Sequence, residues 1–222
     1  MKLKLKRAIS NLFGAIAAVL MVAVVFFSLV FISFKVIYTE TTVRGYSMLP
    51  TLNSTVATAE EDGDTAYLNP YAEIKSGDVV VAEVAWWDKG PIIKRAVGVP
   101  GDEIQIIVEN EFYKLLVNGK ELYAKEINSN TTQHYNQYTA FLTNPQNIAN
   151  GNVKLNENLQ PCIKLNQNEY FLIGDNWGHS SDSLTHGVVF ELELIGRVDI
   201  VVKQNENKII SIFTSMLKIM FS

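Results

Sequence analysis

The longest apolar stretch of the chain runs from residue 8 to residue 34 and contains no charged side chain. A helix needs roughly 20 mostly apolar residues to cross the hydrocarbon core of a bilayer, so this stretch is long enough for a membrane anchor. The alternatives are a cleaved secretory signal, whose apolar part has about 7 to 15 residues, and a buried core helix. The run ends with Phe31, Ile32 and Phe34 and not with a small-x-small cleavage site, which favours an anchor that is not removed.

The charges on either side of this run predict how the anchor is oriented in the membrane. Four cations precede it without any acid among them: Lys2, Lys4, Lys6 and Arg7. Only Lys35 follows closely, and short basic flanks stay on the cytoplasmic side. We therefore expect a single-pass protein of the cell membrane, with residues 1–7 in the cytoplasm and the chain from residue 35 onward outside.

Residues 35–207 show short β-branched runs between turn residues and no long helical pattern, which predicts a mostly β domain with an antiparallel, barrel-like sheet. The expected strands are 78–84, 92–99, 103–108, 112–117, 170–173 and 198–202. Asn118-Gly119 tolerates the positive φ angles of a type I′ turn and predicts a hairpin.

Two segments depart from the β pattern. Residues 127–168 contain 11 Asn and 5 Gln with few apolar residues in periodic order, which indicates a polar surface insertion or a small satellite lobe. Residues 208–222 carry apolar side chains at helical spacing and predict an amphipathic helix. This helix is too short to span a bilayer, so it either packs on the β domain or lies in the membrane interface.

Composition excludes several classes of protein. The chain has a net charge of −4, and all 23 acids follow the anchor, so a basic nucleic-acid binder is disfavoured. A hydrophobic fraction of 48% excludes disorder, and a single cysteine, Cys162, excludes an intramolecular disulfide. The three histidines, His134, His179 and His186, lack metal-ligand spacing and are expected in polar loops, so we predict no metal or other cofactor.

Two segments combine reactive side chains with unusual surroundings. Ser47 stands between Gly45 and Pro50, where a turn can expose the hydroxyl group; such serines are usually only solvated. Lys94 lies inside the apolar strand 92–99, where a lysine must be paired or neutral. Burial lowers the pKa of a lysine, and a neutral amine can take the proton of a serine hydroxyl. A salt-bridged or snorkelling lysine is the alternative.

A third segment, 174–183 (GDNWGHSSDS), follows the strand 170–173 and is rich in small hydrogen-bonding groups. Taken together and in this order, the three segments resemble the bacterial type I signal peptidases, membrane-bound Ser/Lys peptidases that remove signal peptides from exported proteins. The matching sequences are GYSMLPTL at 45–52, GDVVV at 77–81, KRAVGVPGD at 94–102, GDN at 174–176 and SSDS at 180–183.

The resemblance implies a role for particular residues. Ser47 would be the nucleophile and Lys94 its general base. The Ser47 backbone N–H would be one oxyanion donor, with a second backbone donor near Gly45. Ser180 would hydrogen-bond the lysine, supported by Asp182. The pockets for small residues before the cut would be lined by Met48, Leu52 and Ile93.

The substrates implied by the resemblance are preproteins that carry a signal peptide and emerge from the export machinery, cut after a small-x-small motif beside membrane lipids. The third segment departs from the family pattern, because Trp177 and Leu184 stand where arginines are usual. The second of these arginines pairs with the carboxylate matching Asp182, so Arg95 or Arg197 would have to replace it, unless Asp182 faces solvent. A pilus assembly factor, or a dedicated pilin-processing relative with narrow or no peptidase activity, is the alternative function.

Overall fold

The computed structural model describes residues 2–220 and divides into two compact units, one up to Thr39 and the other from Glu40 onward. The first unit is formed by helix α1, Lys2–Ile37, which contains the predicted anchor at 8–34. Within it, Ser10–Ile37 is long and apolar enough to cross a membrane. Residue 1 of the predicted basic segment and residues 221–222 of the predicted C-terminal helix lie outside the described residues.

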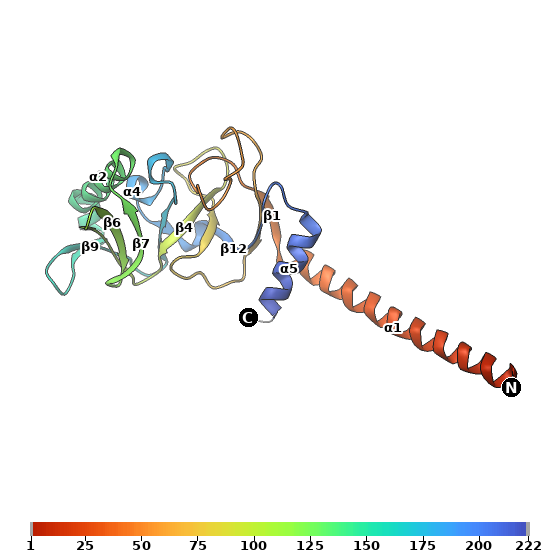
Figure 1. The fold of residues 1–222 in the computed structure, drawn as a ribbon. Coiled ribbons are helices and arrows are strands. Elements are labelled where there is room, and N and C mark those ends of the chain that lie inside the picture. Colours follow the sequence, from red (N-terminus) through yellow and green to blue (C-terminus); the bar gives the residue numbers. More distant parts are fainter. Residues whose placement is uncertain (1, 221–222) are drawn as a thin grey trace. The chain divides into compact units, whose positions relative to one another are not determined.

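The second unit contains two sheets (Figure 1). In spatial order, the larger sheet consists of β1 (Thr39–Thr42), β2 (Thr65–Asn69), β12 (Leu194–Val202), β3 (Val79–Ala82), β4 (Ile92–Gly98), β10 (Glu169–Ile173) and β11 (Val189–Phe190). The smaller sheet consists of β7 (Lys120–Glu126), β6 (Phe112–Val117), β5 (Glu103–Glu109), β9 (Pro161–Lys164) and β8 (Val153–Leu155).

Each strand pair with a described register is antiparallel, which confirms the predicted mostly β, antiparallel fold behind an N-terminal helix. All six expected strands are present, with ends that differ by a few residues. Asn118 and Gly119 have φ angles of 51° and 74° between β6 and β7, as a type I′ hairpin requires.

The expectation of no long helix between the anchor and the C-terminal segment is wrong. Residues Ser129–Thr143 of the Asn-rich segment form helix α2, and Pro145–Ala149 form α3. The Asn128 side chain caps α2 by accepting from the Asn130 and Thr131 N–H groups. Tyr138 and Phe141 are buried in one core cluster with strands of the smaller sheet, and this burial stabilises a helix whose residues have low helix propensity.

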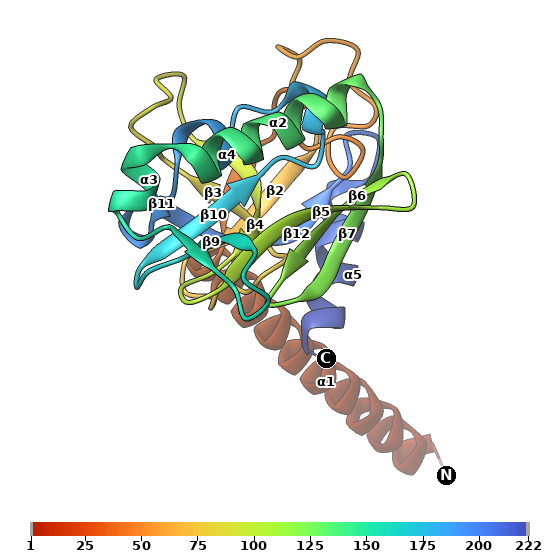
Figure 2. The same ribbon diagram turned by 90° about the vertical axis from the view of Figure 1, so that its left-hand side faces the viewer.

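Short helices connect the last strands. They are η1 (Trp177–His179), α4 (Ser183–His186) and η2 (Glu191–Glu193). Helix α2 packs against η1 and α4 (Figure 2). This packing brings the Asn-rich segment beside the loop that follows β10.

The C-terminal helix is present as α5, Lys208–Met220. Its first turn is tied to the β domain, because Lys208 Nζ donates to Glu40 Oε1 at 2.5 Å and lies 5.9 Å from the centre of the Tyr67 ring. Ile209 and Ile210 of the same turn are 79% and 62% exposed. The helix thus contacts the domain and also presents apolar surface.

Candidate active site

A turn between β1 and β2 holds Ser47, and the loop after β10 fastens this turn from outside. The Asn176 backbone N–H donates to the Ser47 carbonyl at 2.9 Å, and the Asn176 side-chain amide donates to the Tyr46 carbonyl at 3.0 Å. Gly174 lies against the same carbonyl, since a Cβ on Gly174 would lie 2.6 Å from the Ser47 oxygen. The serine backbone therefore sits against a loop that is distant in sequence.

Lys94 projects from the middle of β4. Its strand pairs with β3 on one side, opposite Val80, and with β10 on the other. The Lys94 residue is 5% exposed and shares its buried side of the strand with Ile92 and Ala96, as strand alternation predicts. Burial lowers the pKa of Lys94 from 10.5 to about 8, against an opposing effect of the Asp182 carboxylate.

The structure brings Ser47 and Lys94 into direct contact. Lys94 Nζ lies 2.8 Å from Ser47 Oγ and also donates to the Ile93 carbonyl at 3.1 Å. The first distance suits proton transfer between a hydroxyl and a neutral amine. With a lowered lysine pKa, the pair has the properties of a nucleophile beside its base.

The contact lies in the wall of a cleft of about 810 Å³. Ile93 lines this cleft together with Val81 and gives its wall an apolar surface. Met48 and Leu52 do not line it. They are each 2% exposed and pack in a core cluster with Val43, and their role in the substrate pockets stays a prediction. Both are apolar residues in a turn whose inner side faces the β domain.

The backbone N–H groups of Ser47 and Gly45 differ in whether they are free to serve as oxyanion donors. Among residues 2–220, the Ser47 N–H has no hydrogen-bond partner. The Gly45 N–H donates to the Ala59 carbonyl at 3.0 Å and is thereby occupied, so Gly45 itself is not the second donor. Gly45 has a φ of 81°, and its role is to turn the chain into the Ser47 segment.

Asp182 is fully buried beneath the pair. Its Oδ2 accepts from the Ser180 hydroxyl at 2.6 Å and from the Gly174 N–H at 3.1 Å, and its Oδ1 accepts from the Leu184 N–H at 3.2 Å. The Ser180 hydroxyl thus bonds Asp182 and not Lys94. Asp182 acts on Lys94 through its charge, by raising the lysine pKa.

Neither predicted arginine pairs with Asp182. Arg95 forms its ion pair with Asp175, and Arg197 forms ion pairs with Asp199 and Asp78. Asp182 does not face solvent either, so each of the three alternatives for it is wrong. The side chain that lies beside it is His134, whose Nε2 is 3.6 Å from Asp182 Oδ2.

Comparison with known proteins identifies the family. The family model for signal peptidase, peptidase S26, matches residues 14–203. The chain belongs to this signal peptidase family. It is 30% identical to signal peptidase IB of Staphylococcus aureus strain Mu50 over 176 residues, which cover 78% of this chain and 81% of that protein. It is also 30% identical to signal peptidase I P of Bacillus subtilis subsp. natto over 183 residues, or 81% and 82% of the two chains.

A signal peptidase I of Enterococcus faecalis V583 is a further match among solved structures. It is 21% identical, and the alignment covers 57% of this chain and 97% of that one with a TM-score of 0.35. Membership of the signal peptidase family makes the chain a peptidase, and its long apolar helix fits a membrane protein.

The sequence pattern predicted the wrong surroundings for His134 in this signal peptidase. It was expected in a polar loop, but it lies on the buried face of α2 and is fully buried. The loop prediction failed because the surrounding Asn and Gln residues concealed a helical repeat of buried positions, Thr131, His134, Tyr138 and Phe141. Counting spacings of three and four residues within the segment would have found it.

Asp175 and Thr51 were also missed as parts of the site. Thr51 Oγ1 donates to Asp175 Oδ2 at 2.5 Å, and Arg95 holds the same carboxylate. All three lie within segments that match the signal peptidase pattern. The sequence did contain a hint of this ion pair: an acid, Asp175, directly follows Gly174, and an arginine, Arg95, directly follows Lys94.

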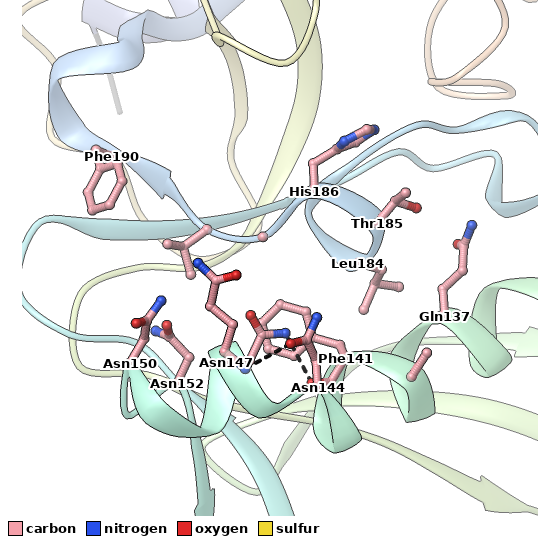
Figure 3. A pocket seen from close by; sticks show the side chains of 14 residues that line it. Gln137, Phe141, Asn144, Asn147, Asn150, Asn152, Leu184, Thr185, His186 and Phe190 are labelled. Carbon is pink, nitrogen blue, oxygen red and sulfur yellow. Dashed lines mark hydrogen bonds between the residues drawn. The ribbon is translucent and has the colours of Figure 1, made fainter.

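A second cavity, of about 500 Å³, lies between α2, α3 and α4 and includes neither Ser47 nor Lys94 (Figure 3). Leu184 points toward α2 in this view, whereas His186 points away from it. Six of its 14 lining residues are Asn or Gln, and most of the others are apolar. Within residues 2–220, no cluster of His, Cys, Asp and Glu side chains could hold a metal ion.

Proposed function

We propose that this chain is a type I signal peptidase with Ser47 as nucleophile and Lys94 as general base. The 2.8 Å separation of Lys94 Nζ and Ser47 Oγ, at the wall of an 810 Å³ cleft, is the observation that carries this proposal. A lysine pKa of about 8 supports it, because a useful fraction of the amine is neutral near physiological pH.

In the proposed reaction, neutral Lys94 accepts the proton of the Ser47 hydroxyl as Oγ attacks the scissile carbonyl carbon. The carbonyl oxygen becomes an oxyanion, for which the Ser47 N–H is a donor. Losing one such donor typically costs about 3 kcal/mol of transition-state stabilisation. A second donor would have to come from a group other than the Gly45 N–H.

Collapse of the intermediate breaks the C–N bond, and the Lys94 ammonium returns its proton to the leaving amine. An ester between Ser47 and the substrate remains. Neutral Lys94 then takes a proton from water, whose oxygen attacks the ester carbonyl and releases Ser47 Oγ. The lysine proton passes to Oγ, which restores both groups without a cofactor.

The proposed substrates are exported preproteins cut after a small-x-small motif. Ile93 and Val81 in the cleft wall supply the apolar surface for this preference, because a close apolar wall excludes larger side chains. The proposed topology places residues 1–7 in the cytoplasm and the catalytic domain outside, following the excess of cations before the anchor. Exposed Ile209 and Ile210 are the proposed contact of α5 with membrane lipids.

The direct test is cleavage of a purified preprotein by the full chain in detergent or vesicles. We expect Ser47→Ala and Lys94→Ala each to abolish product formation while the thermal unfolding transition is retained. Lys89→Ala is the matched control, because Lys89 lines the same cleft but stacks on the exposed Trp87 ring 5.4 Å away. An active Lys94→Ala enzyme would contradict the mechanism.

N-terminal sequencing by mass spectrometry of secreted and surface proteins, after depletion of the enzyme, tests the substrate range. Accumulation of many uncut preproteins is expected for a general signal peptidase. Accumulation of a single uncut client would replace this with the dedicated processing function.

A further inference from the structure

His134 is a buried polar side chain whose surroundings call for an explanation. It is fully buried, and neither ring nitrogen has a hydrogen-bond partner of good geometry among residues 2–220. Buried polar groups are normally hydrogen-bonded, and those that are not often belong to functional sites. The Trp177 backbone acts on the imidazole as an acceptor. The carboxylate beside the ring is Asp182, with 3.6 Å between His134 Nε2 and Asp182 Oδ2.

Asp182 is a carboxylate that needs such a neighbour. It is fully buried and receives three hydrogen bonds, from Gly174, Ser180 and Leu184, all of them from uncharged donors. Burial of an ionised carboxylate is costly unless charge or further donors compensate it. The proposed reaction requires Lys94 to be neutral, so at that moment lysine cannot supply the compensating charge.

The packing around His134 holds the ring in place. Its imidazole stacks on the Trp177 ring at a centroid distance of 4.8 Å and an interplanar angle of 25°. Trp177 is itself held by donating from Nε1 to the Tyr123 hydroxyl at 3.4 Å. Leu184, from the other side of the Asp182 loop, is 4% exposed and directed toward α2 (Figure 3). The imidazole is therefore stacked on an indole ring beside the carboxylate.

We propose that His134 is a positioning residue for the reaction, whose imidazole N–H stabilises the Asp182 carboxylate and so controls the field that Asp182 exerts on Lys94. The inference rests on the proposed function. It assigns to helix α2, from the Asn-rich segment, the task of compensating a carboxylate whose loop carries Trp177 and Leu184 in place of cations. His134 acts through Asp182 and contacts no substrate.

The charged and titratable groups of this region define the expected pH behaviour. Burial lowers the pKa of His134, against an opposing effect of Asp182, so the imidazole is neutral where Lys94 titrates. Lys94 faces Asp182 from β4. From β7, Tyr123 has a pKa raised by burial far above this range, and the nearby Arg95 and Asp175 neutralise one another. Lys94 is therefore the group that titrates near pH 8.

Removing the imidazole N–H leaves more of the Asp182 charge acting on Lys94. A carboxylate favours the ammonium form, so the lysine pKa rises and the acidic limb of the activity profile moves to higher pH. We expect a displacement of roughly 0.5 to 1 pH unit, which lowers kcat about three- to tenfold on that limb. KM changes little, because no substrate contact is lost.

The test compares His134→Phe with His134→Gln in the full chain. Phe keeps a ring for stacking on Trp177 but has no N–H, whereas Gln keeps a donor at similar reach and has no ring. We expect the displaced profile with Phe and a profile within about 0.2 pH unit of the parent with Gln. Tyr138→Phe, on the same buried face of α2, is the control for altered helix packing and leaves the profile in place.

If the pH profile of His134→Phe is unchanged and that of His134→Gln is displaced, the ring of His134 has only a packing role and the proposal is overturned. A kcat loss with Phe at an unaltered pH profile also overturns it.

A second measurement does not depend on activity. In the Ser47→Ala chain labelled with ¹⁵N-histidine, only three imidazoles contribute, and His134→Gln identifies the relevant signals. We expect His134 as the neutral Nε2–H tautomer, with a resonance that moves on Asp182→Asn. A signal indifferent to Asp182→Asn overturns the proposal even if the enzyme is an active peptidase. An inactive parent chain with the coupled signal would instead refute the proposed function alone.

Discussion

Arg95 forms a two-point ion pair with Asp175: Arg95 Nε donates to Oδ1 at 2.7 Å and Nη2 donates to Oδ2 at 2.6 Å. The same carboxylate accepts from the Thr51 hydroxyl. Because Arg95 follows Lys94, Thr51 follows Ser47 by four positions and Asp175 follows Gly174, this one side chain joins the three segments that build the site.

Asp175→Leu is expected to destabilise the fold by about 2 to 4 kcal/mol, because it leaves a partly buried arginine without its partner. The Arg95 and Asp175 side chains are 20% and 9% exposed, so solvent replaces the ion pair poorly. Urea unfolding of the full chain in detergent measures the loss. Asp62→Leu is the control, since Asp62 pairs with Arg44 at a surface where both side chains are about two-thirds exposed, and it should leave stability nearly unchanged. Equal effects of the two substitutions would contradict the bridging role of Asp175.

Peptidase activity should rise through the lysine pKa. With a pKa of about 8 for Lys94, roughly a tenth of the amine is neutral at pH 7 and about nine-tenths at pH 9. The value of kcat/KM for a preprotein is therefore expected to increase about tenfold across this interval, reporting a group of the free enzyme. A profile that is flat from pH 6 to pH 9 would exclude Lys94 as the base.

Lys94→Met should stabilise the chain at pH 7 while removing activity. The folded state holds the lysine pKa at about 8 and the unfolded state returns it to 10.5, so the unfolded chain binds more protons between these values. Below pH 8 this difference costs the folded state roughly 3 kcal/mol, which the uncharged Met avoids.

The advantage of Lys94→Met should shrink as the pH rises from 8 toward 10.5, where both states of the parent become neutral. Unfolding free energies at pH 7, 9 and 10.5 measure this trend. A variant that is less stable than the parent at pH 7, or a difference independent of pH, would show that burial does not hold the lysine pKa down.

Gly174→Ala is expected to reduce kcat by about 100-fold, because its Cβ would collide with the Ser180 side chain and with the Ser47 carbonyl oxygen. The second contact is with backbone, so we expect its relief to displace Ser47 relative to Lys94. Ser180→Gly removes the first collision, so Gly174→Ala/Ser180→Gly should be no more active than Gly174→Ala. Recovery of the double variant to the level of Ser180→Gly would place the defect at Ser180 and not at the nucleophile.

The pattern of the sequence was sufficient for much of the architecture. Alternating residues in 92–98 predicted that Lys94 shares a buried face with Ile92 and Ala96, and Asn118-Gly119 predicted its hairpin. Both features depend on neighbours within a few residues along the chain. Met48 and Leu52 show the limit, since an apolar residue in a turn can face either the cleft or the core, and packing against Val43 decided for the core.

The sequence by itself determined the apolar helix and the antiparallel β domain, because both follow from local spacing and residue type. Its resemblance to the signal peptidase family is what pointed to Ser47 and Lys94. Only the tertiary structure decided which charges meet. Arg95 pairs with Asp175 because strands β4 and β10 place Ile173 opposite Arg95. The loop that follows Ile173 therefore carries Asp175 to the arginine. His134 came to Asp182 because α2 buries its apolar face on the smaller sheet, a packing of segments about 50 residues apart that no local pattern encodes.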